Sequence, residues 1–337
     1  ILGAPSDVVA GTQTGSARVF LRTVPSSSRE AVLAPSAGAS GDEAGRAVAI
    51  AADGSRAVLG APGDDVPTSN AGSGRVFVRS GTTWSEEATL LAAARGANDR
   101  LGDAIAFAAD GTRVILGAPM DDTGAGADAG SATVFVRSGA TWTEESTLVA
   151  SGAATTDSFG ASVALTSDGL RALVGAMGDD TPGGADAGSA RLFVRAAATW
   201  TEEATLTAAG GALGDAFGVA LALTTDGARA VVGAWTDDAA GGLDSGSARA
   251  FRLVGSAGTP CSAAAGCASG FCTDGVCCNV ACGNSDPIDC QACSAALTGG
   301  AEGTCAALSA AVAATVTCRA AGGCDVPEVC TAGSTTC

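Results

Sequence analysis

Pairs of adjacent aspartates recur at a regular spacing and form the most conspicuous set of side chains in the 337-residue chain that could do chemistry. They stand at Asp64, Asp65, Asp121, Asp122, Asp179, Asp180, Asp237 and Asp238. Two neighbouring carboxylates on one loop, together with backbone carbonyl oxygens, could bind a divalent cation weakly. Alternatively, these aspartates could accept hydrogen bonds from backbone amides and so build turns. The sequence leaves both interpretations open.

A second set of carboxylates consists of the glutamate pairs 86–87, 144–145 and 202–203. Two acids are the machinery of glycoside hydrolysis, but neighbours on one strand point to opposite faces of its sheet and do not converge on a substrate. An active site also needs an asymmetric set of groups, whereas these pairs recur in three copies. We therefore predict that they lie on exposed outer strands, where some pair with arginines, and that the nearby Trp84, Trp142 and Trp200 are packing residues.

The composition excludes several classes of function. The chain contains no His and no Tyr, which rules out Ser-His-Asp and Cys-His catalysis, histidine metal sites and a tyrosine nucleophile. All 18 basic residues are arginines, and 35 acidic residues leave a formal charge of −17. Such an acidic chain is a poor partner for nucleic acids or anionic membranes.

The elements that must position these side chains are defined by an internal repeat. One glycine in each copy belongs to a Leu-Gly-Ala-Pro string or a degenerate version of it, and these glycines follow one another at a nearly constant interval: Gly3, Gly60, Gly117, Gly175 and Gly233. Each unit holds short apolar runs separated by Asp-Gly or Gly-rich turns, and none holds a helical period. Four-stranded units at a fixed period are typical of a β-propeller, so we predict an all-β propeller of four to five visible blades.

The copies predict eighteen strands in residues 1–254. Complete copies span 34–90, 91–148 and 149–206, whereas 1–33 lacks a first strand and 207–254 lacks the strand with Trp. Eighteen is not a multiple of four, so these strands alone do not specify a closed ring. Either further blades precede Ile1 or the sheets form an open array; we favour the first, because the sequence starts without Met and without a signal-peptide pattern.

The repeat resembles the FG-GAP repeats of bacterial surface and secreted proteins and, more distantly, the propeller of integrin α subunits. The resemblance covers about residues 1–254 and rests on the strings Phe159-Gly160 and Phe217-Gly218, each followed by an Asp-Gly, a Gly-Ala-x and a Gly-Ser motif. In the earlier copies Leu101-Gly102 and Ala44-Gly45 take the place of Phe-Gly. The family implies a propeller, usually seven-bladed, that acts in extracellular recognition or adhesion.

Integrin-type repeats often carry a calcium loop of the form DxDxDGxxD, and here that loop is degenerate. Each copy keeps a single aspartate before glycine; around Asp168 the other ligand positions hold Ala164, Thr166 and Ala172. Calcium takes six to eight oxygen ligands, which one carboxylate cannot supply. We therefore expect no cofactor, with calcium kept open only because the family often binds it.

All thirteen cysteines lie in the final part of the chain: Cys261, Cys267, Cys272, Cys277, Cys278, Cys282, Cys290, Cys293, Cys305, Cys318, Cys324, Cys330 and Cys337. Such a density is typical of a small domain stapled by disulfides in an oxidising compartment. A zinc site with four thiolates is the alternative, but there is only one C-x-x-C pair. We predict a disulfide-rich domain over 261–337 behind a linker at 255–260. The odd count leaves one thiol free or paired outside this sequence.

Two segments of this cysteine-rich domain resemble known modules. The string SGFCTDGVCC is similar to cysteine-rich tails of secreted myxobacterial proteins, and residues 318–337 are similar to the end of disintegrin domains. In that family the loop corresponding to 319–325 can engage receptors.

These observations predict a secreted or cell-surface protein that is not an enzyme. Its propeller loops are expected to bind an extracellular protein or glycan, with no nucleic-acid partner and no membrane insertion in this segment. Two other functions stay open: a structural or spacer component without a discrete ligand, and an extracellular hydrolase that uses carboxylates alone. Specificity is expected where the copies differ, at Arg95 to Arg100, Pro67 to Asn70, Met120 and Trp235.

Overall fold

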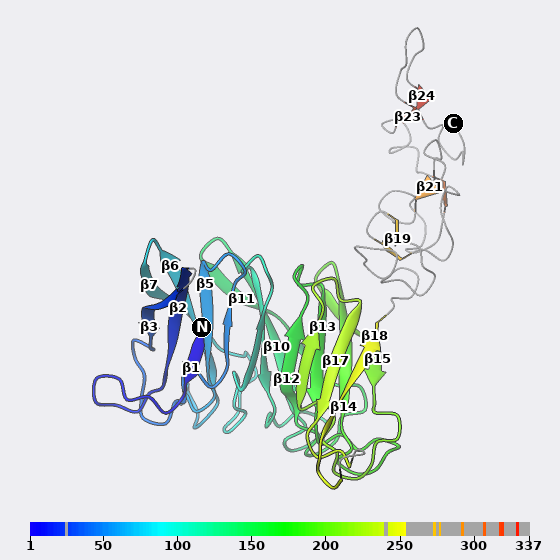
Figure 1. Ribbon diagram of the computed structural model, residues 1–337, viewed down its shortest axis with the longest axis horizontal. Coiled ribbons are helices and arrows are strands. Elements are labelled where there is room, and N and C mark those ends of the chain that lie inside the picture. The colour runs from blue at the N-terminus through cyan, green and yellow to red at the C-terminus, as the bar shows by residue number, and fades with distance from the viewer. Residues whose placement is uncertain are drawn as a thin grey trace. The chain divides into compact units, whose positions relative to one another are not determined.

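The structure is a computed structural model that describes residues 1–23, 26–238 and 242–253, together with the backbone of six short strands between residues 272 and 329. These described residues form β-strands and no helix (Figure 1). The chain divides into two compact units, one made of Ile1–Thr225 and Ala230–Phe251, the other of Asp226–Arg229 and Arg252–Cys337.

The described residues up to 253 form eighteen strands in sheets of three, four, four, four and three, which confirms the predicted number and grouping. The first sheet comprises β1 (Leu2–Ala4), β2 (Ser16–Thr23) and β3 (Ser26–Leu33). The second comprises β4 (Val48–Ile50), β5 (Arg56–Ala61), β6 (Ser73–Ser80) and β7 (Thr83–Leu90). The third comprises β8 (Ala104–Phe107), β9 (Arg113–Ala118), β10 (Ser131–Ser138) and β11 (Thr141–Leu148). The fourth comprises β12 (Phe159–Leu165), β13 (Arg171–Ala176), β14 (Ser189–Ala196) and β15 (Thr199–Leu206), and the fifth β16 (Ala220–Leu223), β17 (Arg229–Ala234) and β18 (Ser247–Arg252).

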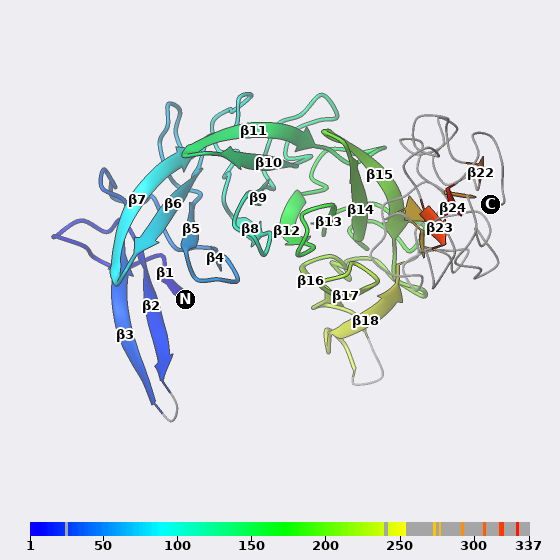
Figure 2. The same ribbon diagram turned by 90° about the horizontal axis from the view of Figure 1, so that it is seen from above.

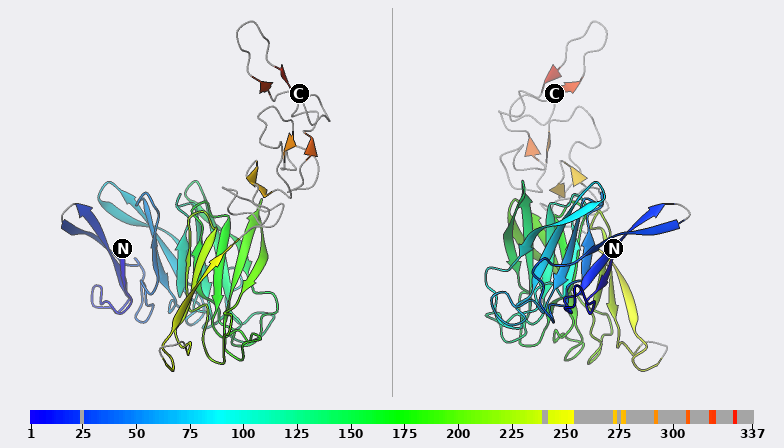
Figure 3. Two further views of the ribbon diagram at one scale, coloured as in Figure 1. Left: turned by 45° about the vertical axis from the view of Figure 1, so that its right-hand side comes forward. Right: turned by 90° about the vertical axis from the view of Figure 1, so that its left-hand side faces the viewer.

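Successive sheets of the first unit follow one another along an arc, with β4, β8, β12 and β16 on its inner side and β3, β7, β11 and β15 on its outer side (Figure 2). Figure 3 shows the same succession of sheets from two further sides. Within the complete sheets, neighbouring strands are antiparallel. Repeated four-stranded sheets in this order fit a propeller with four to five blades.

The burial of strands β9, β13 and β17, which carry the Leu-Gly-Ala string or its degenerate versions, shows which sheets are covered by neighbouring sheets. Strands β9 and β13 are buried at every residue, because another sheet covers each of their two faces. Strand β17 instead alternates between exposed and more buried residues, as expected for a sheet covered on one face. The apolar core therefore lies between the sheets; Phe159 and Phe217 of the Phe-Gly motifs are fully buried in it.

The repeated glycine of the Leu-Gly-Ala string allows two sheets to approach closely. A Cβ atom on Gly117 would lie 1.9 Å from the carbonyl oxygen of Gly160 in the next sheet. Gly60 and Gly175 meet Gly102 and Gly218 in the same way. The glycine spacing that defines the repeat is thus a packing requirement.

The described strands of the second unit are short antiparallel pairs. They are β19 (Cys272–Thr273) with β20 (Val276–Cys277), β21 (Gln291–Ala292) with β22 (Ala306–Ala307), and β23 (Thr317–Arg319) with β24 (Glu328–Val329). The predicted linker at 255–260 and the side chains of all thirteen cysteines lie outside the described residues, so the disulfide domain stays a prediction.

Candidate functional site

The aspartate doublets lie in the connections between the second and third strands of their sheets. Because the strands alternate in direction, the connection from each fourth strand to the next sheet lies at the same end. We call this end the loop face. In each copy, the loop face therefore holds the connection between the second and third strands and the connection that follows the fourth strand.

The first aspartate of three doublets accepts hydrogen bonds from a serine and an arginine on the third strand. Asp179 binds Ser189 and, through a buried ion pair of 2.7 Å, Arg191. Asp64 binds Ser73 and Arg75 in the same manner, and Asp237 binds Ser247 and Arg249.

The first sheet contains a further aspartate of this kind, Asp7, which binds Ser16 and Arg18. The sequence analysis missed Asp7 because no second aspartate follows it.

The second aspartate of each doublet caps its own loop. Asp65 accepts a hydrogen bond of 2.8 Å from the backbone amide of Asn70, and Asp122 accepts one of 3.0 Å from Asp128. Asp180 and Asp238 do the same for Asp186 and Asp244. All four amides belong to residues with φ between 49° and 52°, a conformation in which Asn and Asp are favoured. Among the described residues, no group of three or more Asp, Glu or Cys side chains is arranged to hold a metal ion.

A third aspartate recurs on the loop face; the sequence analysis included one of the four, within the segment from Arg95 to Arg100, and missed the other three. These are Asp42, Asp99, Asp157 and Asp215, each buried and each accepting a hydrogen bond from the amide three residues before it. Burial raises the pKa of Asp42, Asp99 and Asp157. Their recurrence at the period of the repeat was the signal that could have identified them.

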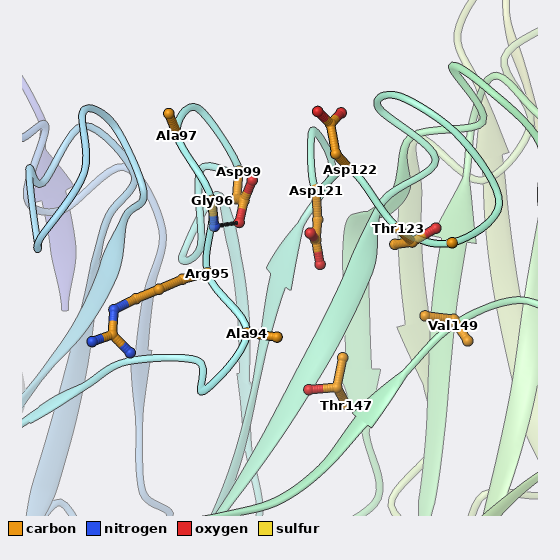
Figure 4. A pocket seen from close by; sticks show the side chains of 11 residues that line it. Ala94, Arg95, Gly96, Ala97, Asp99, Asp121, Asp122, Thr123, Thr147 and Val149 are labelled. Atoms are coloured by element: carbon orange, nitrogen blue, oxygen red, sulfur yellow. Dashed lines mark hydrogen bonds between the residues drawn. The ribbon is translucent and has the colours of Figure 1, made fainter.

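The third sheet departs from this pattern, since Thr133 stands where the other four carry arginine. Asp121 keeps its serine partner, Ser131, at 2.5 Å. Burial and the neighbouring carboxylates of Asp99 and Asp122 raise the pKa of Asp121. An open pocket of about 520 Å³ lies here, lined by Ala94, Arg95, Gly96, Ala97, Asp99, Asp121, Asp122, Thr123, Gly124, Thr147 and Val149 (Figure 4). We call it the third-sheet pocket.

The remaining positions predicted for specificity also lie on the loop face. Met120 and Trp235 are 45% and 63% exposed. The side-chain amide of Asn70 donates to Asn98 at 3.0 Å and so links two adjacent loops. Exposed apolar side chains therefore accompany the acidic ones, although neither Met120 nor Trp235 lines the third-sheet pocket.

The glutamate pairs lie on the outer strands, and the predicted pairing with arginines is confirmed. Glu145 accepts hydrogen bonds from Arg113 of its own sheet at 3.1 Å and from Arg195 and Trp200 of the next sheet at 2.6 and 3.0 Å. Glu87 binds Arg56, Arg137 and Trp142 in the same way. We call each set an inter-sheet clamp. The predicted exposure is wrong, because the side chains of Glu87 and Glu145 are only 10% and 7% exposed between stacked sheets.

The clamp predicts how stability depends on pH. Burial opposes ionisation of Glu145, but hydrogen bonds from Arg195, Arg113 and Trp200 outweigh it and lower the pKa from 4.5 to about 2. Because the folded pKa lies below the unfolded one, the ionised clamp stabilises the fold above pH 4.5 and loses this effect as pH falls toward 2. We expect the difference in unfolding free energy between wild type and Glu145→Gln to shrink by about 3 kcal/mol on acidification. Urea titrations across this range measure it, and a constant difference would contradict the prediction.

Comparison with known protein families identifies the repeat. The family profile described as FG-GAP repeat matches residues 28–78, 84–135, 142–193 and 200–251, which is more than half of the chain. The chain belongs to the FG-GAP repeat family. Each matched FG-GAP unit begins in the outer strand of one sheet and ends in the third strand of the next, so every unit contains one interface between sheets.

Other comparisons add little to the FG-GAP assignment. A search of curated proteins gave no match. Among solved structures, a chain of Kuenenia stuttgartiensis hydrazine synthase matches with 12% identity and a TM-score of 0.35. The match covers 56% of this chain but only 41% of that one, and a similarity this weak carries no argument about function. In the described part of the FG-GAP chain, no helix has the length and apolar character needed to cross a membrane.

Proposed function

We propose that this protein is a secreted or cell-surface binding protein that recognises an extracellular protein or glycan through its loop face. The third-sheet pocket is the observation that carries the proposal. It places three carboxylates around an open space at the one copy whose arginine is replaced. A binding site needs such a departure from symmetry, because a ligand otherwise meets the same surface in every copy.

The proposal does not include catalysis. Asp99, Asp121 and Asp122 occupy positions that recur in other copies, where the same aspartates cap loops or pair with arginine. What differs in the third sheet is Thr133, which supplies neither an acid nor a base at neutral pH. The cysteine-rich domain, with its partly disintegrin-like end, is proposed to be a disulfide-stapled module of the same extracellular protein. Its cysteine density supports an oxidising compartment.

A binding screen with matched variants tests the proposal. The whole chain is applied to arrays of glycans and of extracellular proteins, alongside Asp122→Asn with Asp121→Asn and the control Asp180→Asn in the fourth sheet. We expect bound ligands to be retained by the control and lost by the pocket variant, provided that both keep the circular dichroism of the wild type. An equal loss in both variants, or no ligand on any array, would overturn the proposal.

A further inference from the structure

The arginines on the third strands show what kind of group the loop face is built to hold. Arg191 donates to Ser189 at 3.2 Å, to Thr205 at 2.9 Å and to Glu202 at 3.1 Å, besides its ion pair with Asp179. In the second sheet Arg75 donates to the corresponding Ser73, Thr89, Glu86 and Asp64. Two hydroxyls and two carboxylates thus surround each guanidinium, and as whole residues Arg191 and Arg75 are 8% and 7% exposed.

The third sheet keeps these partners and lacks the guanidinium. Ser131, Thr147, Glu144 and Asp121 stand at the corresponding positions, and two of them, Asp121 and Thr147, line the third-sheet pocket. The short side chain of Thr133 lies 3.4 Å from the Thr147 hydroxyl and carries no charge. The open space therefore coincides with part of the set of hydroxyls and carboxylates that surrounds an arginine in the second and fourth sheets, which we call the sister sheets.

The described residues supply no replacement cation in this pocket. Arg95 is the arginine of the lining, and Figure 4 shows its side chain directed away from Asp99 and Asp121. Its guanidinium donates instead to the backbone carbonyl of Ala92 at 2.6 Å. In the sister sheets Arg75 and Arg191 favour ionisation of Asp42 and Asp157, an effect that has no counterpart for Asp99.

We propose that the third-sheet pocket binds a guanidinium group of a ligand, in the place that Arg75 and Arg191 occupy with their own side chains. The inference rests on the proposed function and names the chemistry that the loop face recognises. A planar guanidinium presents a fork of donors to carboxylates and hydroxyls, whereas an ammonium is a compact point charge. The group could belong to a small guanidino compound or to an arginine of a polypeptide, since both present the same fork.

Calorimetry with defined cations tests this inference. Methylguanidinium is titrated into the whole chain, into Thr133→Arg and into Arg191→Thr, with methylammonium as the matched cation. We expect one site in wild type, none in Thr133→Arg and two in Arg191→Thr, with methylammonium about tenfold weaker. Thr133→Arg is also expected to raise the melting temperature, because it completes a set of contacts that the sister sheets already accommodate.

The outcomes separate this inference from the proposed function. Absence of methylguanidinium binding to wild type, or binding that Thr133→Arg leaves unchanged, overturns the guanidinium inference. The proposed function survives that result if Asp122→Asn with Asp121→Asn still abolishes binding on the arrays. Agmatine and a short arginine-containing peptide distinguish the two sources: tighter binding of the peptide supports a polypeptide ligand, and tighter binding of agmatine supports a small one.

Discussion

Replacing Glu145 by alanine is expected to lower the free energy of unfolding by about 3–5 kcal/mol at neutral pH. The change removes the anion that, among the described residues, forms the ion pairs with Arg113 and Arg195, and it also leaves the Trp200 indole N–H without its acceptor. Two guanidinium groups then stay largely buried between sheets without a counter-charge, which is more costly than losing an exposed ion pair. Urea denaturation followed by circular dichroism measures the loss.

The chain contains a matched control for this substitution. Glu203 stands at the same position of the fourth sheet, and its carboxylate oxygens are buried without a hydrogen-bond partner among the described residues. The fifth sheet provides no clamp for it, since Leu253 takes the place of the arginine. Glu203→Ala is therefore expected to change stability by less than about 1 kcal/mol, or to increase it. Equal losses for the two variants would show that the clamp contributes nothing specific.

Replacing Gly117 by alanine is expected to destabilise the protein by about 3 kcal/mol or more. The added methyl carbon would lie 1.9 Å from the backbone carbonyl oxygen of Gly160, and the backbone of Gly117 fixes the position of that carbon. Neither can turn aside as a flexible side chain would, so the sheets must separate. The measurement is the midpoint of thermal or urea unfolding.

Gly124→Ala is the control for this second substitution. A Cβ atom on Gly124 would meet nothing within 4 Å, and its backbone is not in the left-handed region. The change is expected to stay within about 0.5 kcal/mol of wild type. If Gly117→Ala were equally mild, the close approach of the sheets would not be a requirement of the repeat.

The number and grouping of strands could be predicted from sequence because they depend on local signals. Asp-Gly turns such as Asp168-Gly169 and short apolar runs recur at one period, and each marks a strand end or a strand by itself. The burial of Glu87 and Glu145 could not be predicted in this way. Alternation places neighbours on opposite faces of one sheet, but it does not show that stacked sheets cover both faces.

The candidate site was predicted only in part. The aspartate doublets and the segment from Arg95 to Arg100 were identified, and several of these residues line the third-sheet pocket. Thr133 was overlooked because threonine is ordinary in a strand, and its meaning depends on contacts with Asp121 and Thr147 that only the fold brings together. Comparison of the copies position by position would have found it, since Arg18, Arg75, Arg191 and Arg249 align with it.

The offset between the family unit and the sheets determines how such a chain can change length. Since each unit runs from an outer strand into the next sheet, duplicating or deleting one unit joins ends that already match in sequence and geometry. At the new junction, the clamp glutamate, its arginine partner from the same sheet and the close glycine contact come from residues within the matched units. Recombination between repeats can therefore add or remove copies without new substitutions at the interface between sheets.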